Sequence, residues 1–350
     1  MEAAGMEREV RHGDGRLPQV EVRSYSLPLK VGNEFLGDLA SGSEFRKVLR
    51  HERHRVDCRG EPPFGDDRTH EIEGDDLDEA LREQASTTEG QVVEKAVDTF
   101  SRRFAGVLLR FLDTSEWRGT QRIVCGGGLM EGGVGAELIR RTRRHLREEG
   151  PAVDLRRLHH APDEAGMIGW AFAARPETLG KGDAFVAVDI GGTNLRWGIV
   201  RIDRAAPATE AFTVIRHDKW CHADDAVDRE TVVDRMAEGI RDMIEAAERA
   251  ALRLCPLVGL SCPGVVCPDG RLASGGQNLP GDWSDGAFSL PREVAERIGT
   301  IAGQPPRVLV HNDAVIQALS ELPHLRDVDR WAAVTLGTGL GNCSFDNRAR

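Results

Sequence analysis

Residues 186–200 read VAVDIGGTNLRWGIV, two apolar runs with a short polar connection between them. The connection consists of Gly191, Gly192, Thr193 and Asn194, and Asp189 lies just before the end of the first run. So short a glycine-containing link between two apolar runs predicts a β-hairpin. Glycines leave the backbone N–H groups of a turn accessible, and accessible N–H groups hold phosphate in many proteins. The stretch therefore predicts either a plain tight turn or a phosphate-binding hairpin, with Asp189 placed to hold Mg²⁺ through water.

A second glycine loop follows another apolar run, in WAAVTLGTGLGN at 331–342. It contains Gly337, Thr338 and Gly339. A dinucleotide-binding G-x-G-x-x-G motif would need glycine at position 342, where the chain has asparagine, and no helical pattern follows. Neither loop has the lysine of a Walker motif. Two glycine–threonine loops at strand ends could instead hold one polyphosphate from opposite sides.

A third segment, VLVHNDAVIQALSEL at 308–322, predicts a buried strand that ends at His311, Asn312 and Asp313 and continues as a helix. Asparagine or aspartate before a helix is commonly its N-cap. An aspartate at this position can also act as the general base that takes a proton from a substrate hydroxyl, because phosphoryl transfer depends more on orientation than on basicity. Both roles stay open for this pair of residues.

Asn278 lies in QNLPGDW, within a polar loop after two strand-like runs. Its amide could donate to and accept from a sugar hydroxyl at once. It could equally satisfy the backbone of its own loop.

Composition restricts the class of protein. The 350 residues carry a net charge of −11, which argues against a nucleic-acid partner. There is no run of 18 apolar residues and no basic-then-apolar leader, so we expect no membrane segment, no secretion signal and a cytoplasmic location. The seven cysteines are scattered without a C-x-x-C pair, which favours isolated thiols over disulfides or a zinc site.

Three parts of the chain differ in pattern. Residues 51–90 are highly charged and predict an exposed excursion. Residues 92–112 carry apolar side chains at helical spacing and predict a buried amphipathic helix. The segment 176–183, PETLGKGD, has the composition of a linker. Beyond it, strand-like and helical runs alternate, which predicts an α/β fold. The strand-like runs are 185–190, 195–202, 256–261, 307–311 and 331–336, and the helical runs are 227–252, 290–302 and 314–322.

Taken together, these motifs resemble the ROK (repressor, open reading frame, kinase) family of sugar kinases. The matching pieces are DIGGTN, NLPGDW, HNDA, GTGLG and CGGGLMEGG. The last piece, with Gly126, Gly127 and Gly128, resembles the adenosine-side loop of the family, and residues 163–174 resemble its closing helix. The resemblance implies the two-lobed actin-like ATPase (ribonuclease H-like) fold.

The motifs do not stand in the family's order. In the family the D-x-G-G-T hairpin opens the chain and the G-G-G loop comes near its end. Placing residues 184–350 before 1–175 would restore that order, which implies a circular permutation. The resemblance implies that residues 1–175 form a lobe of the C-terminal type, with the adenosine side and the sugar loop, and that 176–183 form a linker. Residues 184–325 would form a lobe of the N-terminal type, with the hairpin and the catalytic Asp. Residues 326–350 would form the second phosphate loop and return to the first lobe.

The family takes sugar-binding residues from an E-x-G-H motif after the second phosphate loop. Glu9 and His12 have its spacing, although Arg11 replaces the glycine. Exposed N-terminal charges are the alternative interpretation. Gly37 falls near the position of a further sugar-contacting glutamate, for which Glu34 or Asp38 could substitute.

The resemblance implies a kinase that uses ATP and Mg²⁺ to phosphorylate a hexose such as glucose or an N-acetylated amino sugar. Asp313 would be the base, and Asp189 would hold Mg²⁺ through water. The hairpin, the 337–339 loop and the 126–128 loop would bind the nucleotide. The sugar would be oriented by Asn278, Asn312, Glu9 and His12. A homo-oligomer is a further implication. A non-catalytic sugar- or nucleotide-binding regulator of the same fold remains the alternative.

Overall fold

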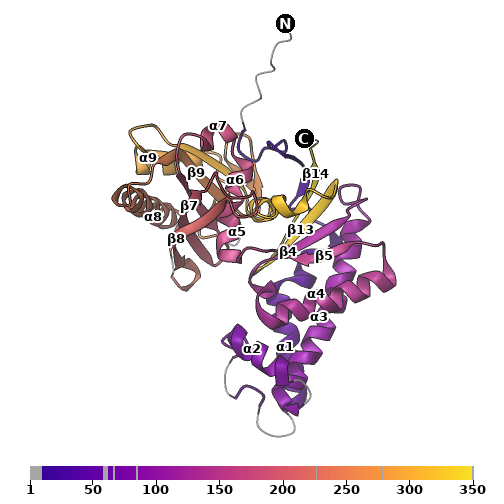
Figure 1. Cartoon of the computed structure of the whole chain (residues 1–350). Helices are drawn as coiled ribbons and strands as arrows, with labels where there is room; N and C mark the ends of the chain where they lie inside the picture. Colours follow the sequence, from indigo (N-terminus) through magenta and orange to yellow (C-terminus); the bar gives the residue numbers. More distant parts are fainter. Residues whose placement is uncertain are drawn as a thin grey trace. The chain divides into compact units, whose positions relative to one another are not determined.

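The computed structural model describes residues 10–57, 62–65, 68–83, 86–225, 227–276 and 279–348. The chain divides into two compact units (Figure 1). Unit 1 comprises Met1–Ser26, Asp163–Asp327 and Phe345–Arg350, and unit 2 comprises Leu27–Pro162 and Val328–Ser344. Each unit has a large hydrophobic core of its own, so each is described by itself.

Unit 1 is built on a five-stranded sheet with the order β12-β9-β6-β7-β8. Its strands are β6 (Ala184–Ile190), β7 (Asn194–Ile202), β8 (Phe212–Cys221), β9 (Leu254–Cys262) and β12 (Arg307–Asn312). The strands β12, β9 and β6 run parallel, whereas β6, β7 and β8 form antiparallel pairs. The strands expected from the alternation pattern are confirmed to within two residues at each end. Parallel strands place their carboxyl ends along one edge of the sheet.

Three helices of unit 1 coincide with the helical runs expected at 227–252, 290–302 and 314–322. The longest, α8 (Arg229–Arg249), is capped by the Asp228 carboxylate, which accepts from the Thr231 N–H. It packs closely on the sheet, because a Cβ at Gly239 would lie 2.3 Å from the Trp197 ring. The other helices are α5 (Pro162–Ile168), α6 (Trp170–Ala173), α7 (Pro176–Leu179), α9 (Leu290–Ile298) and α10 (Asp313–Leu319), with the short 3₁₀ turns η4 (His222–Asp224) and η5 (Leu322–Leu325). The remaining strands of unit 1 are β1 (Val20–Tyr25), β10 (Val265–Val266) and β11 (Leu272–Ser274).

Unit 2 contains a sheet in which β14, β13, β4 and β5 follow one another. These strands are β4 (Arg122–Gly126), β5 (Asp154–Arg157), β13 (Arg330–Leu336) and β14 (Leu340–Asn347), and β4 runs parallel to both β13 and β5. The helices are α1 (Gly42–Asp57), α2 (Gly74–Glu83), α3 (Thr88–Leu112) and α4 (Gly132–Glu149). Short elements complete the unit: β2 (Lys30–Val31), β3 (Glu34–Phe35), η1 (Leu36–Ala40) and η3 (Gly128–Met130).

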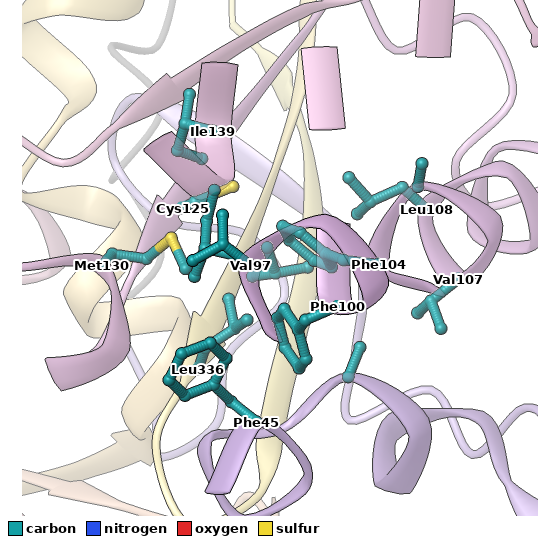
Figure 2. Close-up of a cluster of buried hydrophobic side chains, with 14 of the residues drawn as sticks. Phe45, Val97, Phe100, Phe104, Val107, Leu108, Cys125, Met130, Ile139 and Leu336 are labelled. Carbon is teal, nitrogen blue, oxygen red and sulfur yellow. The ribbon is translucent and has the colours of Figure 1, made fainter. Parts of the chain in front are cut away.

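The core of unit 2 forms around α3, as the helical spacing of residues 92–112 predicts. Figure 2 shows Phe100 and Phe104 of α3 close to Phe45 of α1 and Leu336 of β13. The Phe45 and Phe100 rings meet edge to face, with centroids 5.5 Å apart. Segments distant in sequence therefore meet around α3 through buried aromatic and aliphatic side chains.

The expectation of an exposed excursion over residues 51–90 is wrong in part. Helix α1 continues to Asp57, and α2 occupies Gly74–Glu83. Ile72, Leu77 and Ala80 are buried in the unit 2 core. Leu77 and Ala80, three residues apart on α2, form a narrow buried stripe that the many charges obscure, and Ile72 is buried just before the helix begins.

The expected linker at 176–183 lies within unit 1 and is packed there. It contains α7, and the Arg204 guanidinium donates to the Leu179 carbonyl at 2.9 Å. A Cβ at Gly182 would lie 2.5 Å from backbone atoms of Arg253 and Cys255. Unit boundaries instead fall near residues 26, 162, 327 and 344.

No helix in the described part of the chain is both long and apolar enough to span a bilayer. Six of the seven cysteines are described, and all six are free thiols. Cys58 lies outside the described residues.

Candidate active site

The hairpin predicted at 186–200 forms between β6 and β7. Asp189 pairs with Arg196 in the register, and the Gly191 N–H donates to the Asn194 carbonyl at 2.8 Å. The turn is also held by η4, since His222 Nε2 lies 2.9 Å from the Gly191 carbonyl oxygen. The Ala223 N–H donates to the Thr193 carbonyl at 3.3 Å. The turn therefore has a defined backbone conformation held by hydrogen bonds on both sides.

Asp189 is a buried carboxylate at the base of this hairpin, with only 3% of its surface exposed. Its Oδ2 lies 3.4 Å from the Arg196 guanidinium, whereas Oδ1 has no hydrogen-bond partner. A Cβ at Gly166 of α5 would lie 2.7 Å from this carboxyl group, so only glycine permits the close approach of α5. Burial raises the pKa of Asp189 to about 7, with Arg196 opposing the shift and Asp313 adding to it. An unpartnered buried carboxylate oxygen is unusual and marks a candidate ligand-binding position.

Arg196 links Asp189 to a second carboxylate. Its Nε lies 2.5 Å from Asp163 Oδ1, and Lys219 Nζ lies 3.6 Å from Asp163 Oδ2. Charged groups of alternating sign from β6, β7, α5 and β8 thus lie beside the stem of the hairpin. The sequence analysis missed Arg196, although the hairpin register alone would have placed it opposite Asp189.

Asn312 and Asp313 stand at the same edge of the sheet as Asp189. In the register, Asp189 on β6 is opposite Ser261 of β9, and Asn312 on β12 is opposite Cys262 of β9. The backbones of β6 and β12 at this edge are thus separated by two strand spacings, about 10 Å. The structure brings the hairpin and the HNDA segment to one edge through β9, which carries none of the predicted site residues.

Asn312 is the N-cap of α10, as one of its two interpretations predicts. Its Oδ1 accepts from the Val315 N–H at 3.1 Å. Its Nδ2 donates to the Gly264 carbonyl at 3.0 Å and to Asp313 Oδ1 at 3.1 Å. The amide is therefore fully engaged within unit 1, and its contact with a sugar remains a prediction.

Asp313 opens α10 and is partly exposed. Its Oδ1 accepts from the Ala314 N–H at 2.8 Å as well as from Asn312. Burial raises the pKa of Asp313 to about 6, against the lowering effect of these hydrogen bonds. A carboxylate with this pKa is ionised at neutral pH and still close enough to it to accept a proton efficiently.

His12 lies along the edge strand β12. Its Nδ1 accepts from the Val310 N–H at 3.1 Å, and the Gly13 N–H donates to the Val310 carbonyl at 3.0 Å. Burial and the nearby Arg307 lower the pKa of His12, while Asp269 raises it. These contacts are with β12 and residues near Asp269, and none joins His12 to Asp313. Glu9 and Asn278 lie outside the described residues.

His311 is a buried residue to which the sequence analysis assigned no role. Its Nδ1 accepts from the Asn312 N–H at 2.8 Å, and its Nε2 lies 3.2 Å from the Asp14 carbonyl. Burial lowers the pKa of His311 to about 4, so the ring is neutral at pH 7. His311 therefore fixes the backbone at the end of β12 from which Asp313 projects.

In unit 2 the two other glycine loops lie next to each other. Strands β4 and β13 are parallel neighbours, with Gly126 opposite Thr335. Gly127 has φ +87°, and a Cβ there would lie 2.5 Å from the Leu336 carbonyl oxygen. The position thus requires glycine, because of both the left-handed backbone and the close approach. The Gly337 N–H donates to the Gly339 carbonyl at 3.0 Å, which closes the second loop.

The start of α1 supports the 337–339 loop from one side. The Gly42 N–H donates to the Gly337 carbonyl at 2.8 Å, and Ser43 Oγ donates to the Thr338 carbonyl at 2.8 Å. The carbonyls of the loop are therefore bound within the unit.

The N-terminus of α4, just after the 126–128 loop, is occupied by a carboxylate of the chain itself. Asp78 accepts from the N–H groups of Gly133 and Val134, both at 2.7 Å. This helix end is therefore already capped by a negative charge. The predicted contact with adenosine involves only Gly126, Gly127 and Gly128, which precede this helix.

The hairpin and Asp313 belong to unit 1, whereas the 126–128 and 337–339 loops belong to unit 2. Each unit thus contains its own set of predicted nucleotide-binding residues. The joint binding of one polyphosphate by both sets stays a prediction.

Comparison with known proteins gave matches among solved structures alone. No family model matches the sequence. No curated protein matches it either.

Several of the solved structures that match are named as sugar kinases. The Lmo2764 protein from Listeria monocytogenes is 24% identical, with 47% of each chain covered and a TM-score of 0.33. A ROK hexokinase from Thermus thermophilus is 26% identical, with 45% of each chain covered and a TM-score of 0.31. A ROK family glucokinase from Streptomyces griseus, in complex with glucose and AMPPNP, is 24% identical, with 48% of this chain and 47% of that one covered and a TM-score of 0.34.

The chain spans about half the length of the structures that it matches. Two of these structures are named as ROK proteins, the family that the motifs of this chain resemble. Both match the chain at low sequence identity and over part of its length.

Proposed function

We propose that this chain is an ATP-dependent sugar kinase that transfers the γ-phosphate to a hydroxyl of a hexose such as glucose or an N-acetylated amino sugar. The observation that carries the proposal is the pair of carboxylates at one edge of the unit 1 sheet. Asp189, with its unpartnered oxygen, lies at the base of a glycine hairpin, and Asp313 opens a helix two strands away. Phosphoryl transfer needs a phosphate-binding turn and an oriented base in this kind of arrangement.

The hairpin turn is proposed to bind the phosphates of ATP through Gly191, Gly192, Thr193 and Asn194. Asp189 fits Mg²⁺, because a carboxylate that holds the ion through water leaves the other coordination positions to water and phosphate. When bound, Mg²⁺ would offset the negative charge of the β- and γ-phosphates.

Asp313 is proposed to accept the proton of the sugar hydroxyl. Asn312 donates to its Oδ1 and so fixes the direction of the carboxylate. The sugar would be oriented by Asn312, Asn278, Glu9 and His12. The loops Gly337, Thr338, Gly339 and Gly126, Gly127, Gly128 of unit 2 would contact the nucleotide, and exclusion of water would protect the phosphoryl group from hydrolysis.

The proposed architecture is the two-lobed actin-like fold in circularly permuted order. It is supported by the order of the motifs, since CGGGLMEGG precedes DIGGTN in this chain. The permutation proposed from the motifs places residues 184–350 before 1–175 in the family's order, whereas the two compact units divide the chain near residues 26, 162, 327 and 344. We further propose a homo-oligomer, and the cytoplasm as the compartment, because ATP is available there.

The substitution Asp313→Asn tests the function. It keeps the shape of the side chain and its acceptor oxygen but removes the base, so turnover should fall by about 10² to 10⁴-fold while nucleotide binding persists. The matched control is Asp242→Asn on the exposed face of α8, which should leave turnover unchanged. Turnover of Asp313→Asn equal to that of the unsubstituted chain would remove Asp313 from the mechanism.

A non-catalytic sugar- or nucleotide-binding regulator is the second candidate. It is favoured by the engagement of His12 Nδ1 with the β12 backbone, which leaves less of this ring for a sugar. ATP consumption with a panel of hexoses and N-acetylated amino sugars separates the two. Sugar binding without ATP consumption would favour the regulator.

A further inference from the structure

The turn of the β6–β7 hairpin is held by a buried histidine of η4. His222 has only 2% of its surface exposed, and its Nε2 lies 2.9 Å from the Gly191 carbonyl oxygen. A carbonyl oxygen can only accept a hydrogen bond, so the ring carries a proton on Nε2 and donates it here. Within the described residues, Nδ1 has no hydrogen-bond partner. Among those residues, the ring therefore forms its hydrogen bond with the hairpin turn.

The surroundings of His222 fix the orientation of its ring. The Trp220 and His222 rings meet edge to face, with centroids 6.0 Å apart. Trp220 Nε1 donates to Asp225 Oδ2 at 2.9 Å, and the Asp225 N–H donates to the His222 carbonyl at 3.3 Å. A buried ring nitrogen without a partner lowers stability, so an apolar side chain of similar shape would fill this space at a smaller cost. The contact with Gly191 is therefore the feature that distinguishes histidine from an apolar residue here.

That contact determines the direction of a neighbouring N–H group. The Gly191 carbonyl and the Gly192 N–H belong to one planar trans peptide unit, in which C=O and N–H point in opposite directions. A Gly191 carbonyl held toward η4 thus directs the Gly192 N–H away from η4. The Ala223 N–H donates to the Thr193 carbonyl at 3.3 Å, so a second peptide unit of the turn is held from η4 in the same way.

A turn with two consecutive glycines needs such contacts. Glycine adopts many backbone conformations, so Gly191 and Gly192 do not fix the direction of their own N–H groups. Backbone N–H groups bind an anion well when they converge on it before it arrives. We infer that His222 is a positioning residue of the nucleotide site, whose Nε2–H fixes the Gly191 peptide unit so that the Gly192 N–H faces a phosphate of ATP. The inference rests on the proposed function, because it concerns the hairpin that is proposed to bind ATP.

The test measures the binding of AMPPNP, with Mg²⁺ present, to the full chain by titration calorimetry. His222→Phe keeps a buried ring and removes the donor, so the Kd of AMPPNP should rise about tenfold, the effect of about one hydrogen bond. His222→Gln should keep the Kd within about threefold of the original value, because the glutamine Nε2 can take the place of the histidine Nε2. His222→Asn, whose amide nitrogen corresponds to Nδ1, should weaken binding as phenylalanine does.

Circular dichroism and thermal unfolding check that each variant is folded. If His222→Phe does not fold, the comparison of His222→Gln with His222→Asn gives the same test with two polar side chains. The matched control is His217→Phe, at an exposed histidine of β8, which should bind AMPPNP as the unsubstituted chain does.

Steady-state kinetics gives a readout that a general loss of stability would not produce. In His222→Phe the KM for ATP should rise about tenfold, whereas the KM for the sugar should not change. A rise of both KM values by the same factor would contradict a role of His222 at the phosphates.

The outcomes separate this inference from the proposed function. If the unsubstituted chain binds AMPPNP and His222→Phe binds it equally well, the inference is wrong and the proposed function stands. Equal weakening by phenylalanine and glutamine would also overturn the inference, since packing would then be the cause. A failure of the unsubstituted chain to bind AMPPNP would overturn the proposed function and the inference with it. Asp313→Asn should bind AMPPNP with an unchanged Kd, which distinguishes loss of the base from loss of the turn.

Discussion

At the scale of single residues, the candidate site depends on two carboxylates whose pKa values burial raises. Asp189 reaches a pKa of about 7 and Asp313 about 6. Burying a charge is costly unless it is paired, and Asp189 is only partly paired through Arg196. Carboxyl groups perturbed in this way, next to a glycine turn, are more typical of a functional site than of a structural one.

The pKa of Asp313 predicts the pH profile of the proposed kinase. A general base must be ionised, so kcat/KM for the sugar should be constant above pH 7 when saturating Mg²⁺ and ATP keep Asp189, whose pKa is about 7, in its ionised form. It should fall about tenfold per pH unit below pH 6, the pKa of Asp313. The measurement is kcat/KM from pH 4.5 to 8. The residual activity of Asp313→Asn should lack this acid limb, and an acid limb of equal position in that variant would assign it to another group.

The same pKa predicts that Asp313→Asn stabilises the fold. The folded-state pKa of about 6 exceeds the unfolded value of 3.8, so the folded protein favours the protonated form of Asp313. The contribution of this group to the free energy of unfolding is therefore largest below pH 3.8 and decreases as pH rises from 3.8 to above 6. Asparagine removes this cost, and we expect a gain of about 1–2 kcal/mol at pH 8, less than the full shift implies because Asp313 is partly exposed. Denaturant unfolding at pH 8 and pH 4 measures it. The gain should vanish at pH 4, and a gain that persists there would have another cause.

At the scale of elements, the helix that follows the 126–128 loop depends on a cap from a helix distant in sequence. Asp78 of α2 accepts from two N–H groups at the start of α4. Asp78→Ala should therefore destabilise the protein by about 1–2 kcal/mol, through the lost cap and the lost charge at the helix N-terminus. Denaturant unfolding measures the change. Glu79→Ala, exposed on the same helix, is the control, and equal effects of both substitutions would contradict a capping role.

The elements themselves were predictable where the hydrophobic period was clear. The strands β6, β7, β9, β12 and β13 and the helices α3, α8 and α9 follow from alternation, apolar runs and helical spacing. Helix α2 was not predicted, because Leu77 and Ala80 are its only buried residues among many charges. Two apolar residues among so many charges predict a helix only when the surface on which they pack, here the core around α3, is known.

At the scale of the whole molecule, the division of the chain differs from the expected one. Residues 10–14 run beside β12 in unit 1, although the segment 1–175 was expected to form one lobe. Residues 163–175 also belong to unit 1. Contacts between segments far apart in sequence decide this division, and the order of the motifs carries no information about them.

Restoring the family's motif order tests the proposed permutation. A chain in which residues 176–350 precede 1–175, so that the packed segment 176–183 is kept, would make the segment with Glu9 and His12 continuous with the end of β14. We expect a severalfold lower KM for the sugar with an unchanged kcat, because continuity reduces the entropy lost when the sugar loop is ordered. Steady-state kinetics of both orders measures it. An unchanged KM would contradict a role of the chain order in the sugar site.

The amino-acid sequence by itself determined the α/β pattern, the hairpin turn at 191–193, the HNDA helix start and the resemblance to a kinase family. These features depend on local rules: glycine for a turn, asparagine for a cap, and hydrophobic period for a strand or helix. Only the tertiary structure decided that Asp189 and Asp313 share one sheet edge and that Arg196 and Gly166 enclose Asp189. The physical reason is that burial, pKa shifts and charge clustering depend on neighbours in space, and strand order and helix packing bring those neighbours together.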